Sequence, residues 1–253
     1  MRWRLRDSNP HIVDCLTRDA GLSPVIARLL AARGISTPQQ AQEFLAPSLS
    51  HLHSPYLMSG LRTAVERLRA AIERCETIFI YGDYDVDGTT AVVILKTVLE
   101  ICGGKVEYHV PHRIREGYGM RGEVIEEAAA RGIRLIISVD TGIRAFAAAD
   151  AAERCGVDLI VTDHHLPQAE GVPKAVAVVN PNQAGCEYPC KSLCGAGVAF
   201  KIAQALLEAT GRERLLPSFL KIVAIATIAD SVPLVGENRV SVSYTHLTLP
   251  TKA

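Results

Sequence analysis

The chain has 253 residues, of which 48% are hydrophobic, and its 27 basic and 27 acidic residues give a formal net charge of zero. This length and hydrophobic content allow one large or two smaller folded domains and exclude a globally disordered chain. A nucleic-acid partner cannot be inferred from the overall charge, so any basic surface must be local. No apolar run reaches the roughly 18 residues of a membrane-spanning helix, and no apolar segment follows the basic start, so we expect a cytoplasmic protein without membrane contact.

The first 75 residues have the pattern of helices. Ser23 is a suitable N-cap for a helix that ends at Gly34, and Thr37-Pro38 is typical of the start of another. Apolar residues recur at helical spacing over residues 61–74. We therefore expect a helical N-terminal segment over residues 1–75.

The pattern changes after residue 76 to short apolar runs that alternate with helical stretches. The predicted strands are 77–81, 106–110, 135–139, 159–162 and 175–179. The predicted helices are 90–101, 123–131, 144–155, 196–209 and 217–229. Strands of continuous hydrophobicity that alternate with helices indicate an α/β fold, with a parallel sheet of about five strands and helices on both faces, over residues 76–240.

The last residues, 241–253, have no clear periodicity and fit no element of this pattern. We interpret them as a non-native or read-through tail and leave them out of the functional argument.

Acidic and imidazole side chains follow three of the predicted strands. Residues 82–88 (GDYDVDG) follow the first strand, Asp140 follows the third, and Asp163-His164-His165 follows the fourth. Because ligands bind at the carboxyl ends of parallel strands, these side chains should gather at one edge of the sheet. Clustered carboxylates repel one another, and carboxylate oxygens with imidazole nitrogens suit Mn²⁺ or Mg²⁺. The sequence therefore predicts a metal site at this edge.

Each motif also has a simpler interpretation when it is taken alone. The D-x-D-x-D-G run could be a calcium loop, but Ile94 stands where such a loop needs a bidentate Glu. Asp140 alone could be a helix N-cap. Adjacent histidines in an extended segment point in opposite directions, so we expect only one of His164 and His165 to bind metal directly. The three motifs together favour the metal site.

The motifs GDYDVDG, VDTG (139–142) and TDHH (162–165) resemble the first three motifs of the DHH phosphoesterase family, and Asp230 in ATIADSVPL matches a fourth. Four further blocks resemble the branch of this family that contains single-strand-specific 5′→3′ DNA exonucleases: RGISTPQQAQEFL, PHRIREGYGM, CGAGVAFKIAQAL and GENR. The resemblance covers roughly residues 20–240.

The resemblance implies the role of each ligand. Asp83 would bind one metal, Asp85 would bind the other, and Asp140 would bridge both. His164 and Asp230 would complete the second site. The chemistry implied is phosphodiester hydrolysis by two metal ions roughly 3.5–4 Å apart, with Mn²⁺ or Mg²⁺ as the cofactor.

Three other positions bear on the family comparison. His165 would contact substrate or support the site, and the family assigns no definite role to Asp87. Family members that act on small molecules have a His four residues before the first Asp of motif one, and Phe79 stands there in this chain. This departure favours the exonuclease branch.

Two segments are candidate substrate contacts at the same edge of the sheet. After the second predicted strand, Arg113 and Arg115 can bind phosphate and Tyr118 can stack on a base. Gly195 and Gly197 precede a helix, where backbone N–H groups can hold a phosphate. The alternatives are an ordinary charged surface loop and a tight turn that packs the helix closely.

The resemblance thus implies a hydrolase that removes mononucleotides from single-stranded DNA in repair and recombination. It also implies a single-strand-binding protein and a helicase as partners. Two alternatives stay open: a DHH-family enzyme for small substrates such as oligoribonucleotides or cyclic dinucleotides, and an inactive fragment that lacks the C-terminal DNA-binding parts of the family.

Overall fold

The computed structural model describes residues 7–117 and 119–246. Across these two ranges, every helix is too short or too polar to span a bilayer. The chain forms two compact units, Met1–Leu52 and His53–Ala253, each described by itself below.

The first unit contains short helices that begin in the same way. Its elements are α1 (Pro10–Asp19), α2 (Pro24–Ala32), α3 (Pro38–Leu45) and the 3₁₀ turn η1 (Leu49–His51). Each α-helix starts with Pro directly after a capping side chain, namely Asn9, Ser23 or Thr37. Pro suits the first helical position because its missing N–H would have no partner there. The helices predicted after Ser23 and Thr37 are confirmed, whereas α1 was not predicted.

The second unit is an α/β fold. Its strands are β1 (Thr77–Tyr81), β2 (Lys105–His109), β3 (Leu135–Val139), β4 (Asp158–Thr162) and β5 (Ala177–Val179). Its helices are η2 (Pro55–Leu57), α4 (Leu61–Glu73), α5 (Val86–Ile101), α6 (Gly122–Ala130), α7 (Phe146–Arg154), α8 (Gly195–Ala209), η3 (Glu213–Leu215), α9 (Leu216–Ala229) and α10 (Gly236–His246). All five strands are parallel, in the order β2-β1-β3-β4-β5. The expected sheet of about five parallel strands is confirmed.

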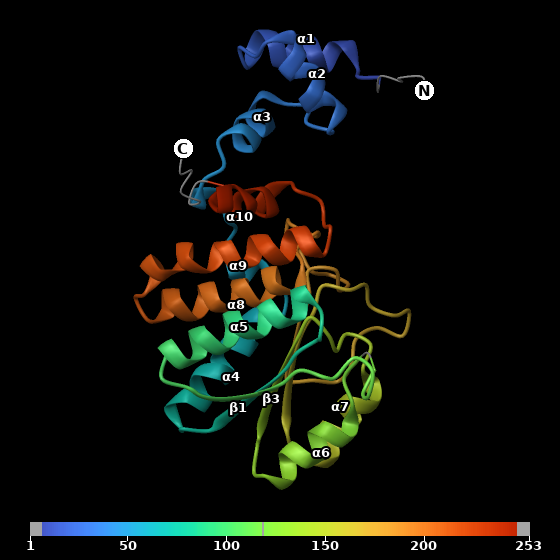
Figure 1. Cartoon of the computed structure of the whole chain (residues 1–253), viewed down its shortest axis with the longest axis vertical. Coiled ribbons are helices and arrows are strands. Elements are labelled where there is room, and N and C mark those ends of the chain that lie inside the picture. The colour runs from blue at the N-terminus through green and yellow to red at the C-terminus, as the bar shows by residue number, and fades with distance from the viewer. Residues whose placement is uncertain (1–6, 118, 247–253) are drawn as a thin grey trace. The chain divides into compact units, whose positions relative to one another are not determined.

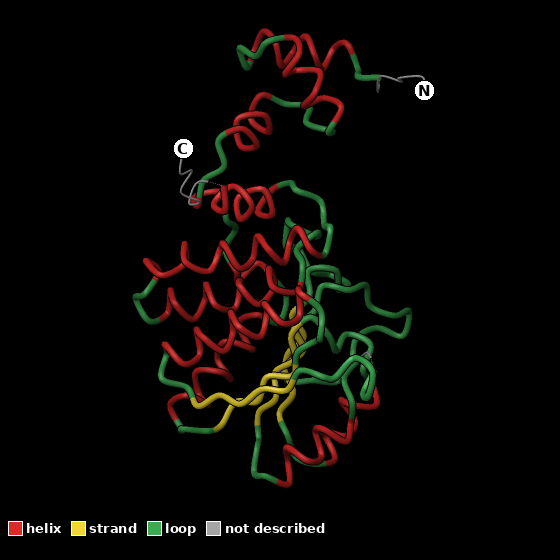
Figure 2. The backbone as a smooth tube through the Cα atoms, viewed as in Figure 1, coloured by secondary structure: helices red, strands yellow, loops and turns green. Residues whose placement is uncertain are grey.

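Helices cover both faces of this sheet. Helices α4, α5 and α8 contact the strands from one side, with α9 packed behind them, and α6 and α7 lie on the other side (Figure 1). Figure 2 shows the strands as a layer between these helices. Phe79, Ile136 and Val161 point into the core beneath α6 and α7, and all five residues of β3 are buried. Burial on both faces explains why most of the strands have continuous hydrophobicity, whereas the edge strand β2 is largely exposed and carries charged residues.

The end of the described chain differs from the expectation. Residues 241–246 continue α10, so the interpretation that they fit no element is wrong. Ser241 and Ser243 are buried and donate hydrogen bonds to the carbonyl oxygens of Asn238 and Val240. Buried serines that bond to their own helix hide the apolar periodicity on which the prediction relied. Residues 247–253 lie outside the described residues, and the proposed origin of the tail stays a prediction.

Candidate metal centre

The predicted site residues lie where the order of the strands reverses. From β1 the chain crosses to β2 on one side, and β3 pairs with β1 on the other side. This reversal leaves a crevice at the carboxyl ends of β1 and β3. Asp83 follows β1 after one glycine, and Asp140 and Asp163 directly follow β3 and β4.

The loop after β1 fixes the first two carboxylates through backbone N–H groups. Asp85 is the N-cap of α5, and its Oδ1 accepts a hydrogen bond of 2.8 Å from the N–H of Gly88. Asp83 Oδ1 accepts a bond of 2.7 Å from the N–H of Tyr84. A Cβ on Gly88 would lie 2.6 Å from the Cβ of Asp83, so only glycine allows the start of α5 to approach this carboxylate. Asp83 is buried and Asp85 is exposed, so the pair lies at the surface of the crevice.

Asp140 is the most constrained of the carboxylates. It has a left-handed backbone conformation (φ 59°), which is rare outside glycine and is often retained at functional sites. A Cβ on Gly195 would overlap the Asp140 carboxylate, so α8 begins directly against it. Burial, together with the negative charges of Asp87, Asp85 and Asp163, raises the pKa of Asp140 to about 10. Its buried Oδ1 accepts no hydrogen bond within the described part of the chain.

His164 lies among three carboxylates. Its Nε2 is 3.2 Å from Asp140 Oδ1, 3.7 Å from Asp230 Oδ2 and 3.7 Å from Asp87 Oδ2. Asp230 directly follows α9, as its C-cap, so this helix delivers the carboxylate from outside the sheet. The distances bring together two residues from strand ends (Asp140 and His164), one from the start of α5 (Asp87) and one from the end of α9 (Asp230).

His165 has a different partner. Its Nδ1 lies 2.7 Å from Asp163 Oδ1, and this contact raises the pKa of His165. Burial opposes the ionisation of Asp163, but hydrogen bonds from His165 and from the N–H of Ile143 outweigh it and lower the pKa of this carboxyl. The sequence placed Asp163 at this sheet edge as the first residue of the D-H-H run but assigned it no role. In the structure it orients His165 and connects the loop after β4 to the loop after β3.

Three overlapping groups of side chains can each hold a cation, with ligand atoms within 4.8 Å of one another. They are Asp83–Asp85–Asp140, Asp87–His164–Asp230 and Asp140–His164–His165. The donors are the hard oxygen and imidazole ligands that suit Mn²⁺ or Mg²⁺. A bound cation would lower the raised pKa of Asp140 and would give a ligand bond to its buried Oδ1, which accepts no hydrogen bond among the described residues, so the residues fit a divalent metal.

The α8 N-terminus holds a carboxylate of the same chain. The N–H groups of Gly195 and Ala196 donate to the two oxygens of Asp87, at 2.5 and 2.7 Å. Gly195 and Gly197 are also fully buried, and Gly197 packs against Leu193. In this structure Asp87 occupies the helix end, which favours the alternative of a close-packed turn. The phosphate contact at Gly195 and Gly197 stays a prediction.

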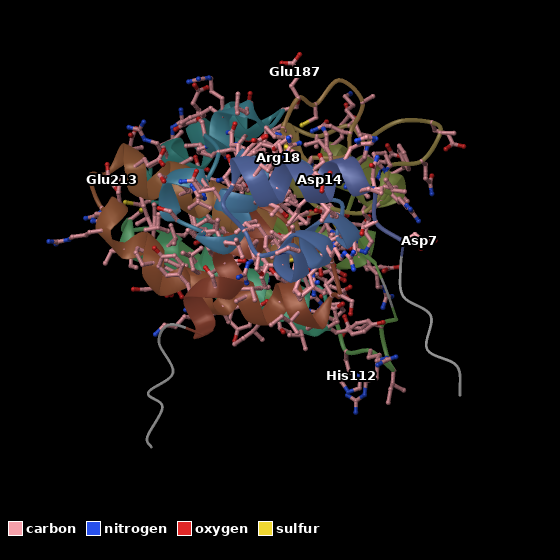
Figure 3. The ribbon with its side chains drawn as sticks, turned by 90° about the horizontal axis from the view of Figure 1, so that it is seen from above. Asp7, Asp14, Arg18, His112, Glu187 and Glu213 are labelled. Carbon is pink, nitrogen blue, oxygen red and sulfur yellow. The ribbon has the colours of Figure 1, made fainter. Side chains whose placement is uncertain are left out.

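The candidate substrate loop after β2 is solvent-exposed. Arg113 and Arg115 are exposed, and the Arg113 guanidinium lies 5.4 Å from the centre of the Tyr84 ring, next to Asp83 in the sequence. His112 projects away from the surrounding side chains in Figure 3. The predicted contact at Tyr118 lies outside the described residues. Arg113 is thus placed beside the metal centre, whereas no contact links Arg115 to it among the described residues.

Comparisons with known proteins agree with this geometry. The family model described as "DHH family, N-terminal domain" matches residues 77–227. The chain is 41% identical over 94% of its length to the single-stranded-DNA-specific exonuclease RecJ of Bacillus subtilis, and 38% identical over 87% to RecJ of Escherichia coli. It spans only 30% and 39% of the length of these two relatives.

A solved structure gives the same result for the fold. RecJ from Thermus thermophilus in complex with Mn²⁺ superposes with a TM-score of 0.80 and 30% identity, over 100% of this chain and 35% of that one. The match of the family model over more than half of the chain, together with these relatives, shows that the chain belongs to the DHH family.

Proposed function

We propose that this chain is the metal-binding and bond-cleaving part of a single-strand-specific 5′→3′ DNA exonuclease that releases mononucleotides. The observation that carries this proposal is the buried Oδ1 of Asp140, which accepts no hydrogen bond among the described residues and belongs to two candidate cation groups. Relatives described as single-stranded-DNA-specific exonucleases support the substrate and the reaction. The direction of digestion rests on the family resemblance.

The proposed ligands surround two cation positions that share Asp140. Asp83, Asp85 and Asp140 have ligand atoms close to one another, and His164 lies 3.2 Å from Asp140 and 3.7 Å from Asp230. Asp83 is the proposed ligand of one cation, and Asp85, His164 and Asp230 are the proposed ligands of the other. Asp140 belongs to groups on both sides, which supports its role as the bridging ligand. Mn²⁺ or Mg²⁺ held there would activate the attacking water and would stabilise negative charge on the scissile phosphate and the leaving oxygen.

Two further carboxylates, Asp163 and Asp87, position groups around the proposed cations. Asp163 holds His165 by its Nδ1, and this contact orients the imidazole beside the cation ligands. An imidazole N–H at this position can donate a hydrogen bond to a phosphate oxygen. Asp87 holds the start of α8 against Asp140, so it positions this ligand rather than touching substrate.

Phe79 supports the exonuclease over an enzyme for small substrates. The small-molecule members of the family place a His at this position, but here the Phe79 ring packs into the core beneath α6 and α7. The cation at Asp83 and Asp85 would therefore have no imidazole from β1. A cytoplasmic location, a single-strand-binding protein and a helicase as partners remain proposals that rest on the resemblance.

Removal of Asp140 tests the proposed function. We expect Asp140→Ala to lower the rate of mononucleotide release from a long single strand in Mn²⁺ by at least about 10³, because both cation groups lose a ligand. The matched control is Asp150→Ala, which removes an exposed carboxylate from α7 and should leave the rate unchanged. A rate for Asp140→Ala within about tenfold of the parent, or a parent that cleaves dinucleotides but not long strands, would contradict the proposal.

A further inference from the structure

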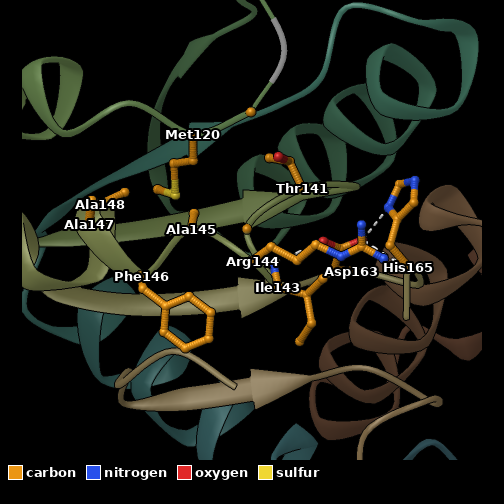
Figure 4. A pocket seen from close by; sticks show the side chains of 12 residues that line it. Met120, Thr141, Ile143, Arg144, Ala145, Phe146, Ala147, Ala148, Asp163 and His165 are labelled. Carbon is orange, nitrogen blue, oxygen red and sulfur yellow. Dashed lines mark hydrogen bonds and ion pairs between the residues drawn. The ribbon is translucent and has the colours of Figure 1, made fainter. Parts of the chain in front are cut away.

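A pocket lies directly beside the metal centre, and residues of the VDTG and TDHH motifs form part of its lining. Its volume is about 540 Å³, which is within the range of small-molecule sites. The loop after β3, the start of α7 and the segment that leads into α6 line it (Figure 4). His165 belongs both to this pocket and to the cation group Asp140–His164–His165. The pocket is therefore continuous with the proposed site of phosphate cleavage.

The pocket has two chemically different ends. Asp163, His165 and Arg144 gather at one side in Figure 4, and Met120 and Phe146 lie at the other. Phe146 is half-buried, so part of its ring remains accessible from the pocket.

A backbone carbonyl group holds the Arg144 side chain at the rim of the pocket. Its side chain is exposed, and its Nε donates a hydrogen bond of 2.9 Å to the carbonyl oxygen of Leu166, just beyond the D-H-H run. This contact fixes the guanidinium beside His165. A positive group in that position can bind a phosphate or a sugar hydroxyl without further ordering.

We propose that this pocket binds the sugar and base of the nucleotide next to the phosphate at the metal centre. The inference rests on the proposed function, and it assigns the substrate a second point of attachment. A nucleotide has a phosphate at one end and a flat, largely apolar ring at the other, which matches the polar and apolar ends of the pocket. Phe146 and Met120 offer surfaces for stacking and few groups that distinguish one base from another, so all four bases should bind.

The experiment compares two ligands that differ only by the base: 2′-deoxyadenosine 5′-monophosphate and 2-deoxyribose 5-phosphate. Calorimetric titration in Mn²⁺ should give at least about tenfold tighter binding of the nucleotide, the magnitude typical of one stacked base. Ala147→Trp places a ring in the pocket from an exposed position of α7 and should remove this advantage. Asp150→Trp adds the same ring to the same helix outside the pocket lining and should preserve it.

The possible outcomes separate the two proposals. Equal affinity of the parent for the two ligands, or an unchanged advantage in Ala147→Trp, would overturn the base pocket. If the sugar phosphate still binds in a Mn²⁺-dependent manner that Asp140→Ala abolishes, the proposed function stands without the pocket. If neither ligand binds in the presence of Mn²⁺, both proposals fail.

Discussion

The two adjacent histidines after β4 have different surroundings, although they belong to the same motif. His164 Nε2 faces three carboxylates at 3.2–3.7 Å, and these belong to three separate elements. His165 instead contacts Asp163, its neighbour in the motif, and lines the pocket beside α7. The two rings nevertheless lie close together, with centroids 4.4 Å apart, and both offer a ligand atom to the group that contains Asp140. The expectation that the two side chains point in opposite directions is therefore wrong, and the assignment of His164 alone as the metal ligand stays a prediction.

Substitution of each histidine by alanine tests whether the two side chains have different roles. We expect His164→Ala to weaken the second cation position and to regain part of its activity in excess Mn²⁺. His165→Ala should keep nearly the metal content of the parent and lose turnover or substrate binding, because its imidazole is held by Asp163. Metal analysis of the two purified variants measures this difference. Loss of metal from the His165 variant alone would reverse the assignment.

At the scale of elements, a buried ion pair joins the helices behind the site. Lys201 Nζ on α8 donates to Glu237 Oε1 on α10 at 2.8 Å, and both side chains are almost fully buried, at 1% and 3% exposed. Lys201 also donates to the carbonyl oxygen of His53 at 2.8 Å, and the Tyr188 hydroxyl donates to Glu237 Oε2 at 2.5 Å. The pair therefore connects α8, which begins against Asp140, to the helix that follows Asp230.

Breaking this ion pair should destabilise the second unit. We expect Lys201→Met to lower the free energy of unfolding by about 3–5 kcal/mol, because it leaves the Glu237 carboxylate buried without its counter-charge. The matched control Lys96→Met breaks an exposed ion pair with Glu100 and should cost less than about 1 kcal/mol. Urea unfolding of both variants measures the difference.

A double variant tests whether the charge itself is the cause. Lys201→Met with Glu237→Gln should be more stable than Lys201→Met alone, because the neutral amide oxygen still accepts the Tyr188 hydroxyl bond and no buried charge remains. A loss for Lys201→Met no greater than for Lys96→Met would show that the ion pair does not hold these helices together.

At the scale of the whole molecule, the features that could be predicted from the sequence are those that depend on local hydrophobic periodicity. The five strands and the helices between them were found because strands buried on both faces are continuously apolar and helices repeat every 3.6 residues. The convergence of Asp83, Asp140 and His164 followed from the rule that the carboxyl ends of parallel strands share one edge. Helix α10 was missed because serines occupy its buried positions.

Features that depend on long-range packing could not be predicted in the same way. The bond between Asp87 and the start of α8 joins residues 108 and 109 positions apart, so the glycines there suggested a phosphate cradle instead. The pocket beside His165 combines residues of the VDTG and TDHH motifs with Phe146 of α7, and the motifs alone do not predict that these residues surround a pocket. In both cases the function of a residue depends on a neighbour that the sequence pattern does not identify.

The central claim is the proposal that carboxylates and the His164 imidazole at this sheet edge hold two divalent cations bridged by Asp140. Titration calorimetry with Mn²⁺ tests it most directly, and we expect two ions per chain for the parent and for the control Asp150→Asn. Asp140→Asn keeps the shape of the side chain but removes its charge, and should weaken the binding of both ions by at least about tenfold. Parental affinity and two bound ions in Asp140→Asn, or no Mn²⁺ binding by the parent, would contradict the account.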